Sequence, residues 1–81
     1  MWNWFRRRSR RWRAKNYLRA YPKDEPAVQR ILQALDTLGP DVVTNARQVA
    51  EMTAGRKLAN AEWGWMGFRW ERAWSAIVPK I

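Results

Sequence analysis

The chain has 81 residues, with 16 Lys or Arg, seven Asp or Glu and seven Trp, and its net charge is +9. A chain of this length forms one domain at most and buries only roughly 60% of the surface of its unfolded state. Cysteine and histidine are both absent, which excludes disulfides, thiolate and imidazole metal sites, and the usual general base. No phosphate-binding loop or dinucleotide fingerprint occurs either, so we expect no cofactor, no metal and no enzymatic activity.

The positive charge is concentrated at the N-terminus. Residues 1–20 carry eight basic side chains and no acidic one, whereas residues 21–81 carry eight basic and seven acidic side chains, a net charge of +1. The stretch 6–11 has no apolar residue, so it lacks a stripe with which to pack on a core. Further along, part of a helix face could be covered by Trp12, Ala14, Tyr17, Leu18 and Tyr21. We expect residues 1–21 to form a basic arm that frays when free and becomes helical against a polyanion. The near-neutral residues 22–81 would form the helical domain.

The apolar pattern predicts three helices in that domain. The first follows the Pro22–Pro26 break, with Asp24 as its N-cap, and ends at Gly39 and Pro40. Its inner face recurs at intervals of three and four and comprises Ala27, Val28, Ile31, Leu32, Leu35 and Leu38.

The second helix begins at Thr44 or Asn45, where Gln48 is placed for a capping-box-like exchange, and it ends at Gly55. The third spans residues 58–77. Gly64 and Gly67 each cost a helix interior about 1 kcal/mol, and we expect them to admit a neighbouring helix beneath the indoles. The rival interpretation is a helix that ends near Trp63 and continues as extended chain.

The arginine run is the main functional signal. Six Arg lie within eight positions, and a guanidinium group offers a forked pair of donors that matches phosphate. We expect these residues to bind a polyanion, with nucleic acid as the favoured partner. The candidate phosphate ligands in the arm are Arg6, Arg7, Arg8, Arg10, Arg11, Arg13 and Lys15.

The tryptophans divide into two groups. Trp63, Trp70 and Trp74 follow the helical stripe of the last helix, so we expect them in the core. Trp2, Trp4 and Trp12 alternate with arginine, and Trp65 widens the last stripe beyond one face. These four indoles either stack on bases or form an interface, and for the arm an anchor at lipid headgroups stays open.

The middle of the chain resembles a known family of DNA-binding modules. Residues 31–40 and 44–55, with the pair Val49 and Ala50 inside the second helix and Gly55 at the turn, are similar to helix-turn-helix and winged-helix modules. The resemblance covers residues 27–74 and implies an all-α, compact three-helix, winged-helix-like bundle. It implies a recognition helix after Gly55, and the implied DNA contacts are Arg56, Lys57, Asn60 and Arg69. Gly55 falls one residue late for this pattern, and the implied recognition helix is rich in Trp.

Three functions remain open. The favoured one is a small nucleic-acid-binding protein whose arm holds phosphates while its helical core supplies placement. The second is a cationic, Trp-rich protein that acts on an anionic membrane surface, as bacteriocin-like peptides do. The third is a component of a larger nucleoprotein or viral assembly, with a protein partner on the Trp-rich last helix. The chain has no secretory signal and no run of apolar residues that spans a bilayer, which favours a cytoplasmic location. A mitochondrial presequence is disfavoured because the arm has one serine.

Overall fold

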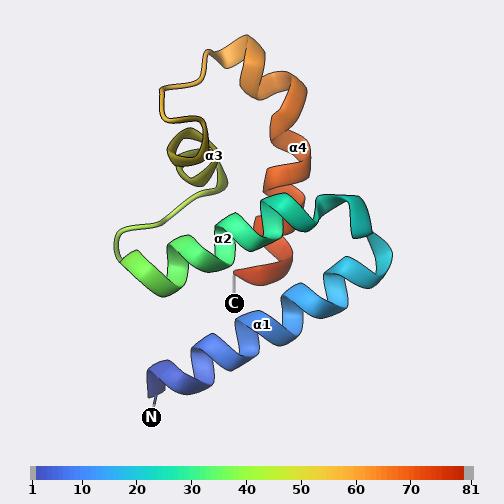
Figure 1. Cartoon of the computed structure of the whole chain (residues 1–81), viewed down its shortest axis with the longest axis vertical. Coiled ribbons are helices and arrows are strands. Elements are labelled where there is room, and N and C mark those ends of the chain that lie inside the picture. The colour runs from blue at the N-terminus through green and yellow to red at the C-terminus, as the bar shows by residue number, and fades with distance from the viewer. Residues whose placement is uncertain (1, 80–81) are drawn as a thin grey trace.

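The computed structural model describes the backbone of residues 2–79 and the side chains of residues 8–79. Its elements are α1 (Trp2–Ala20), a 3-10 helix η1 (Pro22–Asp24), α2 (Glu25–Leu38), α3 (Ala46–Ala54) and α4 (Asn60–Ile77). α4 packs against the three other α-helices and runs from the end of the molecule that holds the α3–α4 loop toward the end that holds α1 (Figure 1). The described residues contain no strand, so the all-α prediction is confirmed. The predicted three-helix, winged-helix-like arrangement is not confirmed, because α1 adds a fourth helix.

The core forms where α1, α2 and α4 meet, with α3 closing one side. The predicted inner face of α2 is buried except at its last residue, Leu38, which is 46% exposed because the helix ends there. Apolar burial contributes about 25 cal/mol per Å², so this cluster is the main stabilising feature. Its buried members are Ala14, Tyr17, Val28, Ile31, Leu32, Leu35, Val43, Val49, Ala73 and Ile77.

The second half of α1 belongs to this core. Ala14 and Tyr17 are 2% and 8% exposed, Leu18 packs beside them, and α1 contacts both α2 and α4. The basic residues 1–21 were predicted to form an arm apart from the domain, and the structure differs on this point. Residues 6–11 do lack an apolar face, but residues 14–18 supply one, and this is enough to dock the helix.

The ends of α3 follow the predicted chemistry. The Asn45 side chain accepts a hydrogen bond from the backbone N–H of Gln48 at 2.8 Å, which is an N-cap. Gln48 does not reciprocate to Asn45, because its amide oxygen accepts from the Thr44 N–H and its amide nitrogen donates to the Val42 carbonyl. Gly55 ends α3 with a φ of 72°, in the left-handed region that favours glycine.

α4 is one continuous helix, so the extended-chain alternative is wrong. The glycines within it do not admit a neighbouring helix as expected. A Cβ on Gly67 would lie 2.7 Å from Cε2 of Trp63, one turn earlier in the same helix, so Gly67 makes room for that indole. A Cβ on Gly64 would meet no atom within 4 Å. The two glycines therefore have different roles.

We predict opposite effects for alanine at these two positions. Gly64→Ala removes backbone entropy from the unfolded chain without a clash, so it should stabilise the protein by about 1 kcal/mol and raise the Tm by about 4–8 °C. Gly67→Ala should lower the Tm, because Trp63 must move. Thermal unfolding followed by circular dichroism measures both, and equal shifts in one direction would contradict this interpretation.

Candidate nucleic-acid interface

A buried polar cluster fixes α1 to the rest of the protein. The Tyr17 hydroxyl donates to Oδ2 of Asp24 at 2.5 Å. Arg72 of α4 donates from Nε to the same hydroxyl at 2.9 Å and from Nη2 to Asp24 Oδ2 at 3.1 Å. The Arg72 guanidinium also lies 3.9 Å from the ring centroid of Tyr21, which stacks on Tyr17. The cluster joins α1, η1 and α4 through three side chains.

This cluster explains why Asp24 does not cap α2 as predicted. Asp24 precedes the helix, but its side chain makes no capping hydrogen bond because it turns toward Tyr17 and Arg72. Burial alone would raise the pKa of Asp24, yet the hydrogen bonds from Tyr17 and Arg72 outweigh burial and the pKa lies below its usual value. For Tyr17, burial and the hydrogen bond to Asp24 raise the pKa. The carboxylate is therefore ionised and the phenol neutral near pH 7.

The basic residues of α1 from Arg8 onward divide between two faces. Arg13 is half-buried and donates from Nε to the Ile77 carbonyl at the end of α4, at 2.8 Å. Burial and the nearby charge of Arg10 lower the pKa of Arg13. Arg10 lies 3.6 Å from Asp36 of α2 and its side chain is only 12% exposed. Two of the predicted phosphate ligands, Arg10 and Arg13, thus serve the docking of α1.

The opposite face of α1 is open to solvent. Exposed side chains recur there every three or four residues, which places them on one side of the helix. Trp12, 67% exposed, lies at its centre. Arg11 borders the face and keeps 62% of its side chain exposed although it pairs with Asp36 at 2.8 Å. We call this surface the cationic ridge: it comprises Arg8, Arg11, Trp12, Lys15 and Arg19.

Sequence reasoning missed Arg19. It belongs to the ridge because it follows Lys15 by four residues and so lies on the same side of the helix. If Ala14 and Tyr17 had been assigned to the buried side of α1, the exposed position of Arg19 would have followed from this spacing. From Arg8 to Arg19 the ridge is roughly 16 Å long at the rise of an α-helix. The side chains of the predicted ligands Trp2, Trp4, Arg6 and Arg7 lie outside the described residues.

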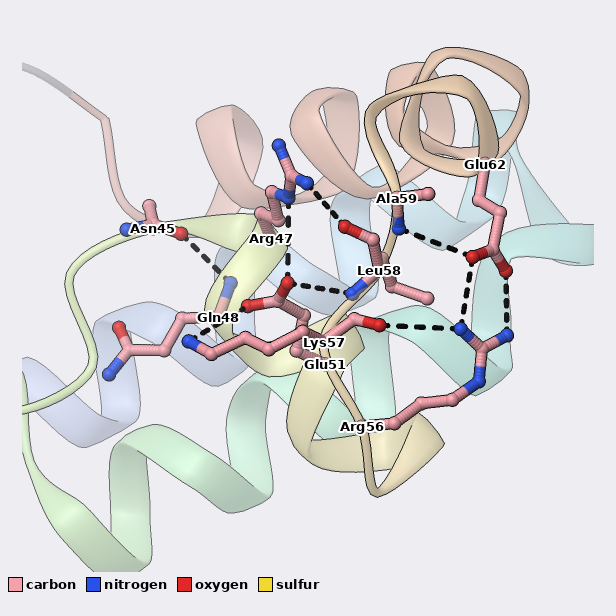
Figure 2. A network of polar contacts seen from close by, with 9 residues as sticks. All are labelled: Asn45, Arg47, Gln48, Glu51, Arg56, Lys57, Leu58, Ala59 and Glu62. Atoms are coloured by element: carbon pink, nitrogen blue, oxygen red, sulfur yellow. Dashed lines mark hydrogen bonds and ion pairs between the residues drawn. The ribbon is translucent and has the colours of Figure 1, made fainter.

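The loop between α3 and α4 holds a second polar cluster, shown in Figure 2. The Glu51 carboxylate accepts from the Leu58 N–H at 2.9 Å and lies 3.6 Å from Arg47 and 3.8 Å from Lys57. The hydrogen bond from Leu58 is the main reason that the pKa of Glu51 is lowered. Arg47 also donates to the Leu58 carbonyl at 2.5 Å, and the Leu58 side chain is buried. The cluster fixes the loop onto α3.

Three of the residues that the helix-turn-helix resemblance singled out, Arg56, Lys57 and Asn60, lie in or beside this cluster, whereas Arg69 lies in the middle of α4. Arg56 forms a two-pronged ion pair with Glu62, at 3.0 and 2.6 Å, and Glu62 also accepts from the Ala59 N–H. The hydrogen bond from Arg56, followed by that from Ala59, lowers the pKa of Glu62 to about 2. Arg56 is therefore already paired with an anion. The Lys57 side chain is 94% exposed, and Asn60 is exposed at the first position of α4.

The two groups of predicted ligands do not meet. Figure 1 places α1 and the loop that carries residues 56–60 at opposite ends of the longest axis of the molecule, along which it extends 40 Å. Each group must therefore be considered as a separate candidate site. The ridge has four basic side chains, of which Arg11 is paired with Asp36, whereas the loop group has Lys57 and Arg56, which is paired with Glu62.

The aromatic side chains of α4 also separate. Trp70 and Trp74 are half-buried against the core, as expected, and Trp63 is half-buried over Gly67 with the Arg47 guanidinium 6.0 Å from its ring. Trp65, in contrast, is 85% exposed. Its indole is therefore accessible to a ligand or a partner, as both of its predicted roles require.

Comparison with known proteins gives no relative: no family model, no curated protein and no solved structure matches the chain. Across the described residues, none of the helices combines the length and apolar character that crossing a bilayer requires. The geometry and charge of the molecule are therefore the basis for any functional interpretation.

We predict that Asp24 makes stability depend on pH. Its pKa is lower in the folded state than in the unfolded state. Its contribution to the free energy of unfolding is therefore fully present above the unfolded pKa of about 3.9 and is lost as the pH falls through the folded pKa. Asp24→Asn should cost about 1–3 kcal/mol at pH 7, and the difference from the wild type should narrow as the pH falls below 4. Urea unfolding at several pH values measures this.

Asp41→Asn makes the same change at an exposed carboxylate and serves as the control. It should leave the free energy of unfolding nearly unchanged at pH 7. A cost of Asp24→Asn that stays constant down to the most acidic conditions would contradict the assignment.

Proposed function

We propose that the protein binds nucleic acid through the cationic ridge of α1. The observation that supports this is the arrangement of the basic residues: four lie on one solvent-facing side of a helix that Tyr17, Asp24 and Arg72 dock firmly. The helix contributes no acidic side chain. A polyanion that lies along this face meets several positive charges without any rearrangement of the fold.

The chemistry of the ridge suits phosphate. Arginine donates two parallel hydrogen bonds to phosphate oxygens, and each phosphate neutralised on a nucleic acid releases condensed counterions. Trp12 lies among these charges with most of its indole exposed, where it can stack on a base. Ordering a ridge that is already helical and docked costs less entropy than folding a free arm on binding.

The ridge is favoured over the loop that the helix-turn-helix resemblance implies. In that loop Arg56 is already neutralised by Glu62, and Glu51 lies near Lys57. A recognition helix in α4 would also present Gly64, Trp65 and Phe68 to the major groove of DNA, where polar side chains are needed to read base edges.

An anionic membrane surface is the second candidate. Trp12, exposed between basic side chains, is the observation that favours it, because indoles settle at the level of lipid headgroups. Its test is binding to anionic vesicles. Binding to vesicles that exceeds binding to oligonucleotides at equal salt would favour this function over the first.

The sharpest test compares one substitution at two sites. Lys15→Gln on the ridge and Lys57→Gln on the loop remove the same charge from exposed side chains on two separate elements, α1 and the α3–α4 loop. For a labelled duplex, we expect Lys15→Gln to weaken binding and to reduce the slope of log K against log salt by about 0.9. Lys57→Gln should leave both unchanged. Affinity measured by fluorescence anisotropy over a salt series gives the slope.

The opposite pattern, with an effect of Lys57→Gln alone, would contradict the ridge and favour the loop. Absence of salt-dependent binding of the wild type to both a duplex and a single strand would contradict nucleic-acid binding altogether. Substitution is required here because deletion of residues 1–20 would remove Ala14 and Tyr17 from the core and unfold the protein.

A further inference from the structure

A groove lies between the start of α2 and the middle of α4. Its lining includes Lys23, Pro26, Ala27, Trp65, Phe68 and Arg69. Trp65 and Phe68 are 85% and 60% exposed, among the most exposed large apolar side chains of the described residues. The two rings line the same groove, and contiguous exposed apolar surface is a feature of ligand and partner sites.

The charges of the groove are positive. Lys23 and Arg69 have no carboxylate within ion-pair distance among the described residues, and Arg69 lies 5.8 Å from the ring centroid of Phe68. The one acid in the lining, Asp24, is buried and already neutralised by Arg72. The occupant that complements this surface is therefore anionic and has an aromatic or other flat face.

The groove lies next to the end of the cationic ridge. Arg19 occupies the last turn of α1, and Lys23 follows it in η1, the turn that leads into α2 (Figure 1). Arg19 and Lys23 are four residues apart in the chain, and Lys23 lines the groove together with Arg69 of α4. One side of the groove therefore follows directly on the end of the ridge in the chain.

We propose that the groove takes an unpaired base of a single-stranded nucleic acid, stacked on Trp65, while Lys23 and Arg69 hold the neighbouring phosphates. This inference rests on the proposed function and specifies its substrate. A duplex hides the faces of its bases within the stack, whereas a single strand offers them to aromatic side chains, and basic grooves with exposed rings are how single strands are held. An acidic peptide would satisfy the charges but has no regular succession of flat faces for Trp65 and Phe68.

The test measures how substitutions at Trp65 affect single-strand and duplex binding. Trp65→Ala should weaken binding of a labelled mixed-sequence single strand by about five- to a hundredfold and leave the affinity for its duplex unchanged. Trp65→Leu keeps an apolar side chain without a flat ring and should behave like Trp65→Ala, whereas Trp65→Phe should retain part of the affinity. Met52→Ala, an exposed apolar position on α3, is the matched control and should change neither affinity. Because Trp65 is exposed, unchanged thermal unfolding is expected for all four variants.

Several results would overturn the inference. If Trp65→Ala leaves single-strand binding unchanged while Lys15→Gln still weakens binding, the groove is not the site, but the ridge stands. If the wild type binds neither oligonucleotide, the proposed function and this inference both fail. If Trp65→Ala instead abolishes self-association of the protein without changing single-strand binding, the groove is a protein interface and not a nucleotide site.

Discussion

The docking of α1 depends on one buried interaction, in which the Tyr17 hydroxyl lies between the Asp24 carboxylate and the Arg72 guanidinium. A helix with many positive charges and no acid repels itself, and its apolar face is short. The cluster adds a charge-assisted anchor from two other elements to the small apolar contact of Ala14 and Tyr17. Charge-assisted hydrogen bonds contribute about 1.5–3 kcal/mol each, which is comparable to burying one large apolar side chain. Loss of this anchor would leave α1 held only by its apolar contact and by the polar contacts of Arg10, Arg11 and Arg13.

Docking determines which basic residues remain available. Arg10 and Arg13 turn toward the protein, where they contact Asp36 and the Ile77 carbonyl. Arg11, at the border of the ridge, also reaches Asp36, whereas the other ridge residues face solvent because a helix that buries one side presents its opposite side to solvent. The same constraint that fixes the fold therefore arranges the remaining positive charges in a row. At the other end of the molecule, Glu51 and Glu62 neutralise nearby cations and order the α3–α4 loop.

Much of the helical organisation could be predicted from periodicity and caps. The buried face of α2, the Asn45 cap, the left-handed Gly55 and the continuous α4 all depend on local spacing, which sequence reports directly. The docking of α1 could not be predicted in this way, because it depends on Asp24 and Arg72, which are 48 residues apart. The role of Gly67 was missed for a different reason: the expectation placed a neighbouring helix beside it, but the side chain that requires it, Trp63, belongs to the same helix.

The candidate site could likewise be predicted only where it depends on local sequence. The basic character of α1 is evident from composition, and most members of the ridge were named on that basis. Which arginines remain exposed depends on the register of the helix against the core, so Arg10 and Arg13 were included and Arg19 was left out. The pairing of Arg56 with Glu62 crosses a loop, and helical spacing does not reveal it.

The central claim is that α1 is a docked helix whose outer face receives the polyanion. Heteronuclear NMR of the labelled protein during titration with an oligonucleotide tests it most directly. The account predicts that, in the free protein, the backbone signals of residues 8–19 have the chemical shifts of a stable helix. It also predicts that the signals of the Trp12 indole and of the Lys15 and Arg19 side chains shift on binding. Signals of a disordered N-terminal segment in the free protein, or shifts confined to residues 56–60, would contradict it.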